Sequence, residues 1–474
     1  QYDIIFMAGG FGAAYDLGYS PVLAEKVSEA YYASNEPVIG GVCHGVLGLI
    51  NAKDRDGKPL ITGRRMTGVT DKQVEELGII EITREEANET AAYQNSNLSV
   101  RATDEFMRAV EADAMWQTIP VHDHDRADEM PSYKAKDLWK WIAEGTWYCG
   151  DPGVQFHSTI NDWHTCPNSG SINASNPCSE YMFLDDSACN LASLNLMKFR
   201  SEARDRREFN VEAFQSAVER TIVAQDSVID GSSYPDPRIA ENAFNYRPLG
   251  LGFANLGALL MSYGLPYDSD EGRAVAASIT ALETGTAYLT STKLAEKLGA
   301  FNGFEENRDP MLRVIGKHRT SLRNIDRSKI PAGLEGVLDA AEEVWAQAER
   351  RGEEFGFRNS QVTVLAPTGT IAFMMDCDTT GVEPDIALVK YKLLAGGGQL
   401  KITNQTVPIA LETLGYDSGQ VEEIVGYISG HDDISRTPFL LEEHRETLTT
   451  TENLKDQRDF LESAGYTKPQ VESI

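Results

Sequence analysis

The spacing of apolar residues along the first eighty positions predicts alternating strands and helices. Short apolar runs over residues 2–8 and 37–42 are typical of buried strands. Between them, residues 21–33 have helical spacing. This order predicts an α/β segment with a parallel sheet, a partial flavodoxin-like unit over residues 1–80.

The rest of the chain divides by polarity and by helix periodicity. Residues 81–92 are polar and acidic and have no wide apolar face, so we place a junction there. Residues 93–430 mix short loops with long amphipathic helices, over 210–229 and 272–298, and are expected to form one large α/β body. Residues 431–474 are a polar tail to which we assign no role.

Composition and charge narrow the classes of function. Hydrophobic residues make up 41% of the 474, and 43 basic against 72 acidic residues give a net charge of −29. Such a surplus repels phosphate backbones and anionic membrane surfaces, so we expect neither DNA nor RNA nor a membrane as a partner. Six cysteines in so long a chain form no disulfide framework, and no secretory signal is evident. A cytoplasmic protein is expected.

One cysteine in the first segment has the setting of a nucleophile. Cys43 follows an apolar strand, lies between glycines and precedes a helical pattern, which favours a sharp turn with the thiol at a helix start. His44 is its neighbour, and Gly10 lies in a glycine-rich turn that could present N–H groups to an oxyanion. A buried structural cysteine is the alternative.

These residues resemble the PfpI-like branch of the glutamine-amidotransferase superfamily. The shared motifs over residues 1–80 are Gly9-Gly10, Asp16-Leu17, Cys43-His44-Gly45 and 63–68. The resemblance implies that Cys43 is the nucleophile, with His44 beside it and Gly10 in the oxyanion pocket. It makes a cysteine hydrolase or a glyoxalase-type stress protein one alternative function for the chain.

A second group of chemical side chains occurs at alternate positions further along. Asn176, Cys178 and Glu180 would point the same way if this loop is extended. An amide, a thiol and a carboxylate suit radical chemistry on a polyol, because sulfur can carry the radical and the carboxylate can take a hydroxyl proton. Pro177 would help to hold the loop rigid. An Asn-Pro turn followed by a packed cysteine is the alternative.

The surrounding motifs resemble adenosylcobalamin-dependent ribonucleotide reductase over about residues 93–430. They occupy 163–168, 176–180, 185–195, 247–252, 366–371 and 376–385. The resemblance implies a partial ten-stranded α/β barrel with a central finger loop. It implies that Cys178 forms the thiyl radical and that Glu180 is the base at the 3′-hydroxyl. It also implies that Asn176 hydrogen-bonds the ribose hydroxyls and that Cys189 is one half of the dithiol that reduces the substrate. It further implies adenosylcobalamin, a ribonucleotide substrate (a diphosphate is expected), a thioredoxin-like or dithiol reductant, a nucleotide effector and a homodimer.

The turn that follows the apolar run 361–365 is a candidate phosphate site. Its N–H groups and hydroxyls can gather around an anion at a helix start, and within the resemblance we interpret it as the substrate phosphate cradle. Its residues are Ala366, Pro367, Thr368, Gly369 and Thr370.

Two further expectations concern metal binding and a third possible function. The remaining cysteines and histidines lack metal-ligand spacing, so no metal site is expected. A catalytically inactive nucleotide-binding fragment is the third function that the sequence leaves open.

Overall fold

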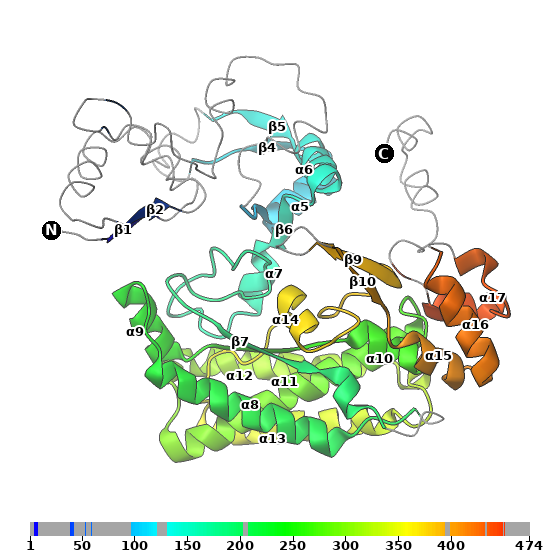
Figure 1. Cartoon of the computed structure of the whole chain (residues 1–474). Coiled ribbons are helices and arrows are strands. Elements are labelled where there is room, and N and C mark those ends of the chain that lie inside the picture. Colours follow the sequence, from blue (N-terminus) through cyan, green and yellow to red (C-terminus); the bar gives the residue numbers. More distant parts are fainter. Residues whose placement is uncertain are drawn as a thin grey trace. The chain divides into compact units, whose positions relative to one another are not determined.

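The computed structural model describes residues 4–7, 38–41, 53, 58, 96–120, 130–201, 207–393, 399–431, 434–448 and 450 (Figure 1). The chain divides into two compact units, residues 1–156 and 157–474, and each is treated by itself. Residues 21–33 and the candidate residues Cys43, His44 and Gly10 lie outside the described residues.

The first unit contains a parallel strand pair at its beginning. Strand β1 (Ile4–Met7) pairs in parallel with β2 (Val38–Gly41), with Ile4 opposite Val38. The two strands and their parallel pairing are therefore as the sequence predicts. The junction at 81–92 and the other domain boundaries stay predictions.

The later part of the first unit packs two helices with two further strand pairs. The helices bury Phe106 and Val110 beside Trp116, whose ring meets that of Phe106 edge-on at a centroid distance of 5.2 Å. The strands pair β3 with β6 in parallel and β4 with β5 antiparallel. The elements are β3 (Ser99–Ala102), α5 (Asp104–Glu111), β4 (Met115–Gln117), β5 (Ser132–Lys134), α6 (Ala135–Cys149) and β6 (Gly153–Phe156).

Long helices form the base of the second unit, side by side beneath strand β7 in Figure 1. Asn210 and Ser269 cap the first two, each side chain accepting a hydrogen bond from an N–H of the first turn. These caps begin the helices close to where the apolar periodicity begins. The four helices are α8 (Val211–Gly231), α11 (Asp270–Leu298), α12 (Phe304–Ser321) and α13 (Glu335–Phe355).

The two helices predicted as amphipathic differ in burial. Helix α8 buries one stripe that includes Phe214, Val218 and Ile222, as an amphipathic helix does. Helix α11 is buried around most of its middle, polar side chains such as Glu283 and Thr286 included. The amphipathic prediction for α11 is wrong because the helix packs against both α8 and α13.

A short parallel sheet lies over the helices and leads to the predicted site segments. Strand β7 (Asn190–Asn195) pairs with β8 (Leu249–Ala254), and Asn190 stands opposite Leu249. On the other side of β8, the chain around Thr363 runs parallel to it: Leu249 N donates to Gln361 O at 2.8 Å, and Val364 N donates to Leu251 O at 2.8 Å.

The described strands do not show the predicted barrel. The ten described strands form five separate two-stranded pairs, the last joining β9 (Val389–Leu393) and β10 (Gln399–Thr403) antiparallel. The mixed helix and strand content confirms the predicted α/β class. A closed ten-stranded barrel is not formed by the described strands.

Shorter helices complete the second unit. They are α7 (His157–Asp162), α9 (Pro237–Tyr246), α10 (Leu256–Ser262), α14 (Gly369–Met374), α15 (Val407–Thr413), α16 (Ser418–Ile428) and α17 (Glu442–Arg445). The 3₁₀ turns are η3 (Leu196–Phe199), η4 (Leu322–Asn324), η5 (Arg327–Lys329), η6 (Ile434–Arg436) and η7 (Glu446–Leu448). Leu440 and Leu448 pack in one apolar cluster with Val407 and Ile424, across the predicted boundary at residue 430. None of the described helices has the length and apolarity that crossing a membrane requires.

Candidate functional site

The candidate radical loop is a tight hairpin. Ser175 and Met182 form an antiparallel bridge, and between them Ser179 N donates to Asn176 O at 3.0 Å. The Asn176 side chain closes the hairpin, since its Oδ1 accepts from Tyr181 N at 2.9 Å. The backbone therefore reverses direction between residues 176 and 179.

This turn overturns the expectation of an extended loop. Pro177 occupies the second position of the turn, where its fixed φ is favoured, and Ser179 has φ 65°. The alternation of an extended strand does not hold across such a turn. The three candidate side chains differ in exposure: Cys178 is exposed, Asn176 is half-buried, and Glu180 is half-buried with its Oε2 buried and without a hydrogen bond.

Glu180 and Cys189 are brought together by the fold. Burial raises the pKa of the Cys189 thiol to about 12, and the nearby charge of Glu180 adds to the rise. The Cys189 sulfur is half-buried and is unpaired with any of the other described cysteines. At neutral pH it is therefore a protonated thiol, a donor of hydrogen rather than a thiolate nucleophile.

Two glycines of β8 allow this close packing. A Cβ on Gly250 would lie 2.3 Å from the Cys189 sulfur and 3.2 Å from Val364 Cγ2. A Cβ on Gly252 would lie 2.3 Å from the carbonyl oxygen of Val364 and 3.8 Å from Ala366 N. Only glycine fits at either position, so β8 holds Cys189 beside the strand that runs into the 366–370 turn.

The predicted phosphate turn is a helix start, as expected. Helix α14 begins at Gly369, after Thr368 in the left-handed conformation (φ 54°). Thr368 is buried, and its hydroxyl oxygen accepts from Gly381 N at 2.6 Å, whereas Pro367, Gly369 and Thr370 are exposed. The N–H groups that open a helix have no partner within it, which leaves them to an anion or to water.

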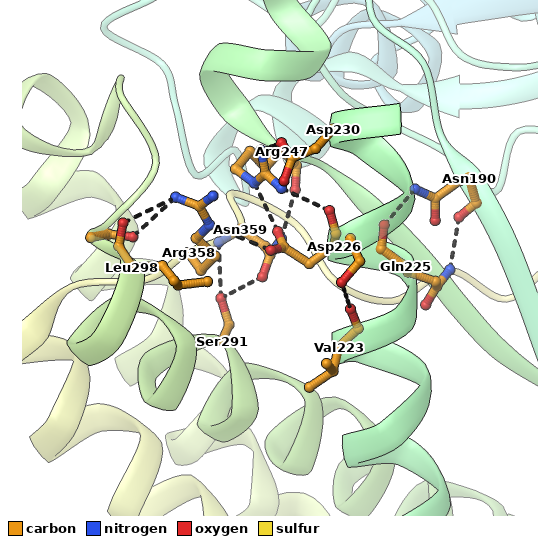
Figure 2. Close-up of polar contacts among 12 residues, drawn as sticks. Asn190, Val223, Gln225, Asp226, Asp230, Arg247, Ser291, Leu298, Arg358 and Asn359 are labelled. Carbon is orange, nitrogen blue, oxygen red and sulfur yellow. Dashed lines mark hydrogen bonds and ion pairs between the residues drawn. The ribbon is translucent and has the colours of Figure 1, made fainter. Parts of the chain in front are cut away.

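A hydrogen-bonded network on α8 ties the two site segments together (Figure 2). Gln225 and Asn190 exchange two hydrogen bonds, at 2.9 and 3.1 Å, between side-chain amides and main-chain oxygens. The next residue of α8, Asp226, accepts from the buried Arg247 at 2.8 Å and from Asn359 at 2.9 Å. One turn of α8 therefore fixes the residue after Cys189 and the segment that enters the 361–366 strand.

A cavity of about 380 Å³ lies beside the 175–182 hairpin and the segment around Thr363. Glu180 lies on its wall, together with Thr363, Val364 and Leu365 from the strand. The wall also includes Glu283 of α11, a carboxyl that is 0% exposed and has no hydrogen bond on either oxygen. The cavity thus connects the base of the hairpin with the core of the helical layer.

Reasoning from motifs missed Glu283, and it gave no role to Gly250 although the motif 247–252 contains that residue. Glu283 belongs to no recognisable motif, and its signal is that it is the only charged residue between Ala274 and Thr292. Gly250 is one of several glycines in an apolar run, and the sequence does not say which of them faces a sulfur. Among the described residues, no group of three or more His, Cys, Asp or Glu side chains could hold a metal ion.

The comparisons with known proteins cover most of the chain. The family model "Ribonucleotide reductase, barrel domain" matches residues 69–472. A "Vitamin B12-dependent ribonucleotide reductase" of Rhodopirellula baltica is 54% identical over 359 residues, 76% of this chain and 34% of that protein. A protein of the same name from Agrobacterium fabrum is 47% identical over 367 residues, which are 75% of this chain and 28% of that protein. A "Vitamin B12-dependent ribonucleoside-diphosphate reductase" of Mycobacterium tuberculosis is 27% identical over 421 residues, 88% and 53% of the two chains.

The chain spans about a third of the length of its most similar curated relatives among these. The match confirms the resemblance predicted for residues 93–430, whereas the PfpI-like resemblance of the first segment stays a prediction. By its match over 69–472, the chain belongs to the ribonucleotide reductase family.

Proposed function

We propose that this chain is the part of a vitamin B12-dependent reductase that reduces ribonucleotides to 2′-deoxyribonucleotides. The names of the relatives support this function. The observation that carries it is the grouping of Glu180 and Cys189 at the base of a hairpin that exposes Cys178, beside the strand leading to the 366–370 turn.

Each candidate side chain has a separate role in the proposed reaction, chosen to fit its environment. Cys178 loses a hydrogen atom, and the resulting thiyl radical removes one from the ribose. Glu180 accepts the proton of the 3′-hydroxyl, and the free buried Oε2 supports this role. Asn176 keeps its Nδ2 group for the ribose hydroxyls because its Oδ1 is engaged by Tyr181. Cys189, a protonated thiol, supplies one of the two sulfurs whose oxidation to a disulfide reduces the substrate.

The exposure of Cys178 fits adenosylcobalamin as the radical source. When bound, adenosylcobalamin supplies a carbon-centred radical through homolysis of its cobalt–carbon bond. A hydrogen-atom donor for a group of that size must be reachable, and the Cys178 thiol is exposed at the turn of the hairpin. The hairpin, closed by Asn176, holds the thiol in place without covering it.

The 366–370 turn is the proposed phosphate site. Gly369 and Thr370 are exposed at the start of α14, where N–H groups and a hydroxyl favour an anion. Thr368 retains its O–H as a donor, although its oxygen already accepts from Gly381 N. We propose a ribonucleoside diphosphate as the substrate, and the name of the Mycobacterium tuberculosis relative supports that choice.

We also propose an assembly around this site, which the family resemblance supports. We propose that the strands of this chain belong to a ten-stranded barrel, with the 175–182 hairpin as its finger loop. A thioredoxin-like protein or small dithiol would restore the cysteines, a nucleotide effector would regulate turnover, and two copies would form a homodimer in the cytoplasm. The name of the matched domain supports the barrel.

The function is tested by product formation. The chain is incubated with a ribonucleoside diphosphate, adenosylcobalamin and dithiothreitol, and deoxynucleotide is measured by chromatography. Cys178→Ser is expected to abolish product, whereas Glu354→Gln, an exposed change on α13, leaves it unaltered. Product that survives Cys178→Ser refutes the assignment.

A further inference from the structure

The two cysteines of the proposed reaction lie on different parts of the chain. Cys178 is exposed in the 175–182 hairpin, whereas Cys189 is half-buried directly before strand β7. Strand β8 fixes Cys189, because Gly250 leaves just enough room for its sulfur. Both sulfurs can act on one ribose only if the hairpin is also held in a fixed place relative to β7.

A second turn, at 184–187, connects the hairpin to β7. Asp186 adopts the left-handed conformation in this turn, with φ 52°. The Ser187 hydroxyl closes the turn by donating to the carbonyl oxygen of Leu184 at 2.6 Å. Asn242 of helix α9 donates to a main-chain oxygen of the same turn at 3.0 Å. The turn is therefore attached to the helical scaffold.

Tyr181 joins the hairpin to this second turn. Its main chain belongs to the hairpin, since Tyr181 N donates to Asn176 Oδ1 at 2.9 Å and Asn176 N donates to Tyr181 O at 3.4 Å. Its side chain leaves the hairpin, and the phenol hydroxyl donates to Ser187 Oγ at 3.0 Å. One residue thus contacts both turns.

The surroundings of Tyr181 make this connection firm. The side chain is 8% exposed and packs in the apolar core, where its ring lies 6.3 Å from that of Phe183. Burial raises the pKa of the Tyr181 hydroxyl, which therefore keeps its proton and remains a donor, and charge on the nearby Cys189 would raise it further. A buried hydrogen bond of this kind is costly to leave unmade.

We propose that Tyr181 is a positioning residue that holds the Cys178 hairpin in place relative to Cys189 through its hydrogen bond to Ser187. This inference rests on the proposed function, in which both sulfurs meet one ribose. The Tyr181 hydroxyl acts through the 184–187 turn and not on the substrate. Its loss should therefore harm the step that uses Cys189 more than the step that uses Cys178 alone.

The first test is thiol labelling of the chain alone, without nucleotide or cobalamin, with the labelled peptides identified by mass spectrometry. Tyr181→Phe removes only the hydroxyl. The rate at Cys189 relative to Cys178 should rise by about fivefold, because one buried hydrogen bond is lost. Tyr263→Phe is the matched control, since it removes another buried phenol hydroxyl, which donates to Glu208 O at 2.9 Å. It should leave the ratio of the two rates unchanged.

The second test separates the two steps of the proposed reaction in D₂O with adenosylcobalamin and a ribonucleotide. Deuterium on the 5′-carbon of the cofactor reports hydrogen-atom transfer by Cys178, and deoxynucleotide reports reduction by Cys189. Tyr181→Phe should incorporate deuterium as the wild type does but form deoxynucleotide about tenfold more slowly, because a misplaced reacting group slows the step that uses it. Tyr263→Phe should match the wild type in both.

Ser187→Ala breaks the same hydrogen bond from the other side and replaces Tyr181→Phe if that variant does not fold. The double variant should label as Ser187→Ala does, because the two changes remove one shared contact. An unchanged labelling ratio in both single variants, or equal losses of deuterium and deoxynucleotide, would overturn the inference. If the wild type forms no deoxynucleotide, the proposed function fails, and the labelling ratio still decides the role of Tyr181.

Discussion

Two buried acids on neighbouring helices, Asp226 of α8 and Glu283 of α11, have opposite surroundings. Asp226 accepts hydrogen bonds from Arg247, Asn359 and, at 3.4 Å, Arg358. Glu283 has no partner on either oxygen and faces a cavity. The first arrangement is what a structural carboxylate requires, because a buried charge is tolerated only when it is paired and hydrogen-bonded. The second leaves the acid available to water and protons.

The difference distinguishes an acid that holds the fold together, Asp226, from an acid that has no such hydrogen bonds, Glu283. The Asp226 network holds the ends of two segments that form the site, as Figure 2 shows. Neither carboxyl oxygen of Glu283 has a hydrogen-bond partner, and the residue lies in an otherwise uncharged stretch of α11, so its charge contributes no polar contact to the scaffold.

The largest effect on stability is expected from removing Asp226, the acid that is paired. Asp226→Ala leaves Arg247 buried without its main partner and should lower the free energy of unfolding by about 3–5 kcal/mol. Asp230 bonds the same guanidinium from an exposed position, so Asp230→Ala should cost less than about 1 kcal/mol. Urea unfolding measures both. Equal losses would show that burial of the pair is not what stabilises the network.

Removing the unpaired acid should change how stability depends on pH. Below pH 4.5, the ordinary value for glutamate, Glu283 is protonated in both states and contributes no pH dependence. Between there and its folded pKa of about 8, the unfolded chain ionises and the folded chain does not, so stability falls as pH rises. This loss, about 3 kcal/mol between pH 5 and pH 8, should be absent in Glu283→Gln.

Unfolding of both proteins at several pH values checks this. Parallel pH profiles for the wild type and Glu283→Gln would contradict the assignment of a protonated, unpaired carboxyl. Tyr288 and the neutral histidines on the cavity wall are present in both proteins, so their contributions cancel in the difference.

A smaller effect is expected where packing, and not charge, positions the site. Gly250→Ala would place a methyl group 2.3 Å from the Cys189 sulfur and should cost about 1–3 kcal/mol. Gly426→Ala, in the interior of α16 with no atom within 4 Å of the new Cβ, should be neutral or stabilising. Thermal unfolding compares the two variants, and the same result for both would mean that Cys189 does not need the glycine.

The smallest effect on stability is expected at Cys178. Its side chain is exposed, so Cys178→Ser should change the free energy of unfolding by less than about 0.5 kcal/mol. Cys166 is 0% exposed in the apolar core, and Cys166→Ser should be clearly destabilising. Thiol labelling of the folded chain should modify Cys178 before Cys166. Preferential labelling of Cys166 would contradict a hairpin that exposes Cys178.

The sequence predicts some of this and fails where contacts are distant along the chain. Apolar runs located β1 and β2, and helical periodicity located α8 and α11. Motifs singled out Cys178, Glu180 and Cys189, whose roles stay predictions. The extended loop favoured at 176–180 was wrong because alternation presumes an extended backbone. The alternative, an Asn-Pro turn, is what forms, although Cys178 is exposed and not packed. The burial of α11 and the cavity at Glu283 depend on α13 and the hairpin, which no local pattern of α11 encodes.

The central claim, that Cys178 carries the unpaired electron, is tested most directly by hydrogen exchange. The chain is incubated with adenosylcobalamin and a ribonucleotide in D₂O, where the thiol takes deuterium from the solvent. Reversible hydrogen-atom transfer should then place deuterium on the 5′-carbon of the cofactor, as measured by mass spectrometry. We predict incorporation for the wild type and Cys189→Ser and none for Cys178→Ser. Equal incorporation in the wild type and Cys178→Ser would contradict the account.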